Sequence, residues 1–83
     1  MAKMSYQETT EARAIILRFC DGQGRSASDI LGCTELQPFI GQYDRIVLRD
    51  LIYALEETGL LFSRGKHSGR MYITTKTGRD LIE

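Results

Sequence analysis

Apolar residues recur at intervals of three and four along the first 21 residues, which is the period of one face of an α-helix. This apolar face consists of Ala12, Ile15, Ile16, Phe19 and Cys20. Ser5 and Glu8 have the spacing of a capping box at a helix start, and Gly22 is typical of a helix end. The pattern predicts a first helix over about residues 6–21.

The pattern is weaker from residue 26 to residue 43. Serine and aspartate side chains at its start can cap a short second helix, which carries Ile30 and Leu31 and ends near Gly32. Pro38 and Gly41 then interrupt any long helical spacing of apolar residues. We therefore expect an ordered loop or a single helical turn over residues 34–43.

The clearest period in the chain predicts a third helix over residues 44–58, with Asp44 as its cap and Gly59 as its end. Its inward stripe consists of Leu48, Leu51, Ile52 and Leu55. Ile46 and Tyr53 fall on the remaining faces, where apolar side chains indicate either a contact surface or packing against a neighbouring loop.

From residue 60 the period changes to that of β-strands. Residues 60–64 and 70–75 are β-prone and enclose a basic tip flanked by glycines, which predicts a hairpin. Thr75 can cap a short terminal helix over residues 76–83. The expected order is three helices, two strands and one helix, an α+β arrangement.

Composition limits the size and class of the protein. With 83 residues, 42% hydrophobic and 27% charged, residues 1–83 are expected to form one small domain without room for a deep substrate cleft. No apolar run is long enough to span a membrane, and a cytoplasmic location is expected. The two cysteines, Cys20 and Cys33, are predicted to be buried thiols, and no metal or other cofactor is expected.

Charge is distributed unevenly, although the formal net charge is zero. Residues 1–60 carry six basic and nine acidic side chains, a net charge of −3, whereas residues 61–83 carry five basic and two acidic side chains, a net charge of +3. The carboxy-terminal part can therefore present a local positive field that the near-neutral isoelectric point of about 6.6 conceals.

Enzymatic chemistry finds little support in the sequence. The segment from Gly59 to Gly65, followed by Lys66, has five residues between its glycines where a phosphate-binding loop requires four. Glu56 and Glu57 are adjacent and point about 100° apart on a helix, so they cannot act as a paired acid and base. A binding protein is expected, not an enzyme.

Two runs resemble the winged helix-turn-helix domains of small bacterial and phage transcription regulators. LEETGLL at residues 55–61 resembles the end of their recognition helix, and a basic hairpin follows it, as in those domains. YITTKTG at residues 72–78 resembles the closing motif of the MarR, PadR and ArsR-like branches, with Thr74 in the usual leucine position. The resemblance covers most of residues 10–82, although the stretch 32–43 is longer than the usual turn.

The resemblance implies a winged helix-turn-helix fold with three helices, a β-hairpin wing and a short C-terminal helix. It also implies sequence-specific binding of double-stranded DNA by a small transcriptional regulator, with helix 44–58 in the major groove and hairpin 60–75 as the wing. The implied DNA-binding residues are Gln42, Tyr43, Arg45 and Arg49 of the helix and its start, and Arg64, Lys66, His67 and Arg70 of the wing.

An alternative function stays open at this point. Winged helices also serve as protein-binding modules, and a near-neutral domain that exposes Ile46 and Tyr53 could bind a component of a larger nucleic-acid-handling complex without binding DNA itself. The sequence leaves open whether the protein acts as a monomer or a homodimer.

Overall fold

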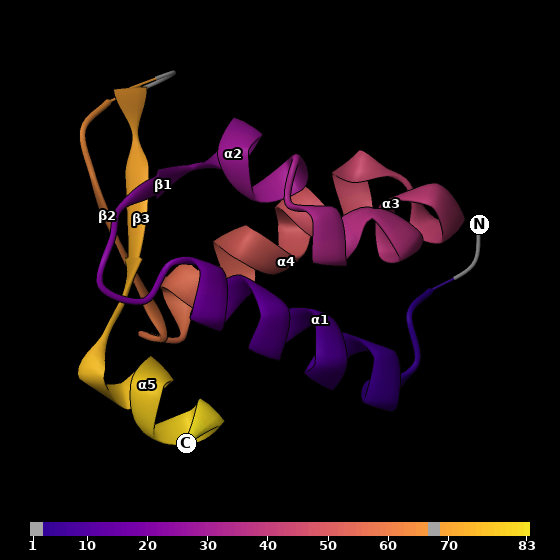
Figure 1. Ribbon diagram of the computed structural model, residues 1–83, viewed down its shortest axis with the longest axis horizontal. Helices are drawn as coiled ribbons and strands as arrows, with labels where there is room; N and C mark the ends of the chain where they lie inside the picture. The colour runs from indigo at the N-terminus through magenta and orange to yellow at the C-terminus, as the bar shows by residue number, and fades with distance from the viewer. Residues whose placement is uncertain (1–2, 67–68) are drawn as a thin grey trace.

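The computed structural model describes residues 3–66 and 69–83. They form an α+β unit in which a small antiparallel sheet stands at one end of a group of helices (Figure 1). Its radius of gyration is 11.8 Å, close to the roughly 12 Å expected of a compact chain of this length. The elements are α1 (Tyr6–Phe19), β1 (Arg25–Ser26), α2 (Ala27–Leu31), the 3₁₀ turn η1 (Thr34–Leu36), α3 (Gln37–Tyr43), α4 (Arg45–Glu57), β2 (Leu61–Arg64), β3 (Met71–Thr74) and α5 (Lys76–Ile82).

The first helix begins where its capping box predicts. The Glu8 backbone N–H donates to Ser5 Oγ, and the Ser5 backbone N–H donates to Glu8 Oε1, both at 3.1 Å. These bonds satisfy N–H groups that have no partner within the helix. The predicted helix 6–21 is therefore confirmed, with its end two residues earlier at Phe19.

The expectation of a loop or a single turn over residues 34–43 is wrong, because the segment forms η1 and then α3. Pro38 lies in the first turn of α3, where a backbone N–H has no intrahelical acceptor and proline is tolerated. The Gln37 side chain donates to the carbonyl oxygens of Leu31 and Cys33 at 3.0 and 2.9 Å. These two bonds tie the start of α3 back to the end of α2.

The sheet has the strand order β1-β3-β2, with both pairs antiparallel. The predicted hairpin is confirmed as β2 and β3, with Leu61 opposite Thr74 and Arg64 opposite Met71. Strand β1 was not expected, since two residues are too few to produce a period of their own. By pairing with β3, it places the start of α2 beside the hairpin.

The core lies between α1, α2 and α4. The inner residues Leu48, Ile52 and Leu55 of α4 are buried, as predicted, whereas Leu51 is only partly buried. Other large side chains that are fully buried include Ile16, Leu17, Ile30 and Leu36. The predicted α4 is confirmed, and the Asp44 carboxylate accepts from the Arg45 N–H at 2.6 Å.

The hairpin is fixed to the helices by a group of residues that we call the hairpin foot: Gly59, Leu60, Thr75 and Gly78. Thr75 Oγ1 donates to the Gly59 carbonyl oxygen at 2.7 Å and accepts from the Gly78 N–H at 3.0 Å, which caps α5. Gly78 packs so closely on Leu60 that a Cβ atom there would collide with the Leu60 carbonyl oxygen. The foot thus holds the end of α4, the base of the hairpin and α5 together.

Strand β3 also completes the end of α1. Thr74 donates from its side chain to the Leu17 carbonyl oxygen at 2.5 Å and from its backbone to the Cys20 carbonyl oxygen at 3.1 Å. The last carbonyl groups of a helix find no N–H donor within that helix, so these bonds satisfy groups that would otherwise be buried unpaired.

Candidate nucleic-acid interface

The outer face of α4 is an exposed surface with mixed chemistry. Its exposed residues are Arg45, Ile46, Arg49, Asp50, Tyr53, Ala54 and Glu57. Ile46 is 63% exposed and Tyr53 is 44% exposed, which confirms that these two apolar side chains do not pack into the core. The outer face therefore offers cationic and apolar groups to a partner at the same time.

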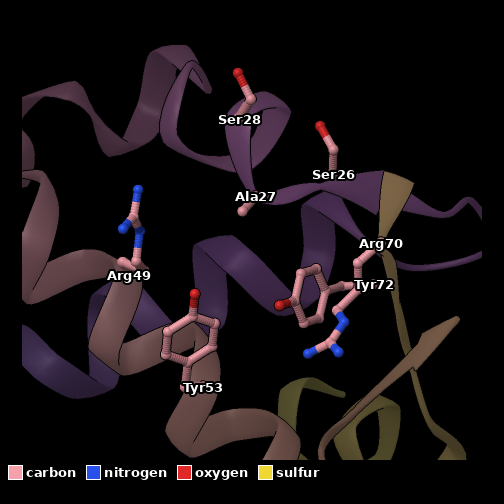
Figure 2. Close-up of a pocket in the computed structure, with 7 residues that line it drawn as sticks. All are labelled: Ser26, Ala27, Ser28, Arg49, Tyr53, Arg70 and Tyr72. Carbon is pink, nitrogen blue, oxygen red and sulfur yellow. The ribbon is translucent and has the colours of Figure 1, made fainter. Parts of the chain in front are cut away.

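A pocket of ≈ 470 Å³ lies beside this face, between the start of α2, the outer side of α4 and strand β3 (Figure 2). It is lined by Ser26, Ala27, Ser28, Arg49, Tyr53, Arg70 and Tyr72. Arg49 and Tyr53 are four residues apart on α4 and so share one helix face. Tyr72 lies in β3, and Arg70 immediately precedes that strand.

The side chains in the pocket differ in how they face it. Figure 2 shows the hydroxyls of Tyr53 and Tyr72 directed into the space, with the Arg49 guanidinium above Tyr53 and the Ala27 methyl group pointing inward. The two serine hydroxyls point away from it, and Ser26 Oγ instead accepts from the Asp29 N–H at 3.0 Å. The polar side-chain groups available to a ligand are therefore phenols and guanidinium groups.

The charge of the pocket is predominantly positive. Over residues 3–66 and 69–83, the structure contains one ion pair, between Arg79 and Asp21 at 2.9 Å, so neither Arg49 nor Arg70 is paired with a carboxylate there. The carboxylate of Glu56, which accepts a hydrogen bond from Ser63, influences Tyr72 in the pocket. Unpaired guanidinium groups beside two phenols favour an anionic ligand.

Tyr72 is held in its neutral, donating form. Burial is the main cause that raises its pKa above the ordinary value of 10.0, the negative charge of Glu56 raises it further, and a hydrogen bond from Arg70 opposes the shift. A neutral phenol can donate its proton to an anion. Tyr72 therefore contributes a hydrogen-bond donor to the pocket at physiological pH.

The structure places the helix residues predicted at the DNA interface in different environments. Arg45 and Arg49 are exposed on α4. Tyr43 is buried, only 7% exposed, and its hydroxyl donates to the Glu8 carboxylate at 2.6 Å. Gln42 is exposed, but its Nε2 donates to the Tyr43 hydroxyl at 3.0 Å. The Tyr43 ring is thus committed to joining α3 to α1 and does not share the surface of the arginines.

The predicted wing residues are also spread out. Arg64 and Lys66 are exposed at the far end of β2 and beyond it, whereas Arg70 is partly buried and lines the pocket. His67 lies outside the described residues. Of the predicted residues, Arg49 and Arg70 therefore line the same pocket, from opposite sides (Figure 2).

The sequence pattern does not assign Tyr72 or the start of α2 to the site. In the sequence, Tyr72 belongs to the motif at residues 72–78, and Tyr53 is expected either at a contact surface or packed against a neighbouring loop. The signal that would have found them is the pairing of Arg25 with Tyr72, which brings Ala27 next to the pocket. That pairing depends on residues 47 positions apart and leaves no local pattern.

The remaining reactive groups are buried or scattered. Cys20 and Cys33 are buried free thiols, as predicted, and burial raises the pKa of Cys20 to about 12. Among the described residues, no group of three or more histidine, cysteine, aspartate or glutamate side chains could hold a metal ion. Within the same part of the chain, no helix is long and apolar enough to cross a membrane.

No protein-family model, curated protein or solved structure matches the chain.

Proposed function

We propose that this protein binds double-stranded DNA as a small transcriptional regulator with a winged helix-turn-helix domain, α4 entering the major groove and hairpin 60–75 acting as the wing. The observation that carries the proposal is the pocket that is lined by Arg49 of α4 and by Arg70 of the hairpin, neither of which has a carboxylate partner among the described residues. Two elements that the proposal assigns to DNA thus share one cationic surface.

The hairpin foot supports the winged-helix assignment. The two runs that carry the resemblance, residues 55–61 and 72–78, are separated in the sequence by most of the hairpin and are joined in the structure by the bonds of Thr75 and the packing of Gly78 on Leu60. Helix α3 accounts for the additional length between α2 and α4 without displacing α4 from the hairpin.

The dimensions of α4 suit the proposed role. Thirteen helical residues give a length of about 20 Å, and the major groove of B-DNA, about 12 Å wide, admits one helix. Asp44 and Asp50 place negative charge near this surface, so binding depends on the local charge of the arginines and not on the net charge of zero.

A titration of mixed-sequence and selected duplexes at several salt concentrations tests the proposal. If Arg49, Arg64, Lys66 and Arg70 neutralise phosphates, log affinity plotted against log salt has a slope of about −3 to −4 per protomer, because each phosphate contributes ~0.9. Lys66→Ala should weaken all duplexes alike. Arg18→Ala removes an equal charge from α1 and serves as the matched control.

The proposal is wrong if duplex binding is undetectable at about 50 mM salt and micromolar protein, since sequence-independent attraction alone should then be measurable.

Protein binding is the second candidate function, favoured by Ile46, whose 63% exposure on α4 is high for a large apolar side chain. The Lys66→Ala and Ile46→Ala variants together separate the candidates, because Lys66 is assigned to a phosphate contact and Ile46 is the exposed apolar side chain. If the partner is DNA, we expect Lys66→Ala to weaken binding more than Ile46→Ala does. If the partner is a protein, we expect the reverse order, since an apolar hot spot at a protein interface contributes about 2 kcal/mol or more.

A further inference from the structure

We infer that Ile46 reads the 5-methyl group of a thymine in the major groove, so that the duplexes bound most tightly carry a thymine opposite the first turn of α4. The inference rests on the proposed function, which brings α4 into that groove. It adds to the implied DNA-binding residues a side chain that carries neither a charge nor a hydrogen-bonding group.

The position of Ile46 around α4 directs it away from the core. Successive residues of an α-helix are about 100° apart, so Ile46 lies about 120° to 180° around the helix from the buried residues of α4, and Asp50 lies about 140° to 160° from them. These buried residues are Leu48, Ile52 and Leu55. The middle of the outer face is thus formed by Ile46 and Asp50, one turn apart.

Arg49 lies nearer to the side of α4, about 60° to 120° from the same buried residues. On that side it lines the pocket, as does Arg70, whereas neither Ile46 nor Asp50 lines it. The middle of the outer face therefore offers an aliphatic group and a carboxylate, and the pocket side offers guanidinium groups.

This distribution of charge matches the cross-section of the major groove, which has base edges on its floor and phosphates along its margins. The guanidinium groups favour a margin of the groove, where the phosphates lie. The Asp50 carboxylate is repelled by phosphates but can accept a hydrogen bond from the cytosine N4 amino group on the floor. The complementary orientation therefore directs the middle of the outer face, and Ile46 with it, at the base edges.

Thymine is the base that suits an aliphatic side chain. Base edges in the major groove carry donors and acceptors of hydrogen bonds, and thymine adds an apolar methyl group. Ile46 is 63% exposed, so it has apolar surface to bury against that methyl group. Opposite guanine or cytosine, the same side chain would displace water from polar groups without replacing the lost hydrogen bonds. The preference for thymine follows from both effects.

Substitution of thymine by deoxyuridine tests the inference, because it removes only the methyl group. The duplex is one that the full chain enriches from a pool of random sequences, and its thymines are replaced one at a time. We expect one position for each bound protomer at which the replacement weakens binding by about fourfold, the loss of one buried carbon group.

The Ile46→Ala variant closes a double-mutant cycle with this replacement. Its shortened side chain should bind the thymine and deoxyuridine duplexes equally, whereas Ile46→Val, which keeps the branched end, should retain most of the difference. Leu81→Ala is the matched control, since Leu81 is also an exposed apolar side chain, 49% exposed on α5. This control should keep the full deoxyuridine effect. Thermal midpoints of the variants show that none of these differences reflects unfolding.

The inference and the proposed function fail in different ways. Duplex binding that no deoxyuridine replacement weakens, or that is weakened equally in the unsubstituted protein and in Ile46→Ala, would overturn the role of Ile46 and leave DNA binding standing. Failure of the full chain to enrich or bind any duplex would overturn the proposed function and, with it, the inference.

Discussion

The two faces of α4 perform different tasks. On the inner face, Leu48 and Ile52 have no exposure and Leu55 is 3% exposed. On the outer face, Arg49 and Tyr53 line a pocket and Ile46 is left uncovered. Since free energy of unfolding depends mainly on buried apolar contacts, changes on the outer face are expected to alter binding while changes on the inner face alter stability.

The largest expected effect tests the inner face. Leu55→Ala removes a buried side chain from a thin core and should lower the free energy of unfolding by about 2 to 5 kcal/mol. Tyr53→Ala, on the outer face of the same helix, is the control and should change it by less than about 1 kcal/mol. Chemical denaturation measures both. Equal midpoints for the two variants would show that the faces are not divided as described.

A pair of glycines extends the comparison beyond α4. Gly78→Ala places a methyl group against the Leu60 carbonyl and the Thr74 side chain, and overpacking of this kind should cost about 1 to 3 kcal/mol. Gly41→Ala, with no atom within 4 Å of its added methyl group, should instead stabilise α3 by about 0.5 to 1 kcal/mol. In thermal denaturation, the midpoints of the two variants should shift in opposite directions from that of the unsubstituted protein. A shift in the same direction would contradict the packing at the hairpin foot.

Asp44 sharpens the comparison at the start of α4. Its backbone has φ 82° and ψ 156°, a region that essentially only glycine adopts without strain. Asp44→Gly should relieve that strain but remove a weak helix cap. We expect a net increase of about 1 kcal/mol in the free energy of unfolding. Asp44→Ala keeps the strain and loses the carboxylate, so it should not stabilise the protein. A gain in the alanine variant would refute the strain argument.

The smallest expected effect concerns the hydrogen bond between α3 and α1. The Tyr43 hydroxyl is the main cause that holds the pKa of Glu8 below its ordinary value of 4.5, and the Ser5 backbone N–H adds to it. The folded state thus favours ionised Glu8, so this stabilisation is complete above about pH 4.5 and is lost as pH falls through the lower folded-state pKa.

Tyr43→Phe should reduce this acid dependence while Tyr6→Phe, a change at an exposed tyrosine, should leave it unchanged. Unfolding followed between pH 6 and pH 2 measures the difference between the two variants. Parallel pH profiles would show that Tyr43 does not set the pKa of Glu8.

Local signals account for the parts of the fold that the sequence predicts. The capping box of Ser5 and Glu8, the apolar stripe of α4 and the cap at Thr75 each depend on residues within one or two turns of each other. Such patterns can be recognised without knowing the tertiary structure. The corresponding helices begin where they were expected.

Long-range contacts account for the parts that the sequence does not predict. Pro38 and Gly41 argued against a helix, yet α3 forms because Gln37 bonds to the end of α2 and Tyr43 reaches Glu8, 35 residues away. The pocket likewise depends on the pairing of β1 with β3. The two arginines of the pocket can be selected from the sequence by their charge. Their position beside Tyr53 and Tyr72 cannot be predicted from it.

The bonds of Thr74 have a consequence for the order of folding. The hairpin foot closes a loop of 16 residues between Gly59 and Thr75, whereas Thr74 reaches Leu17 across 57 residues. Closing the longer loop from the unfolded chain costs about 1 kcal/mol more in entropy. We expect the hairpin to form early and to dock on α1 late, so that α1, although it precedes the hairpin in the chain, is among the last elements to have its final carbonyl groups satisfied.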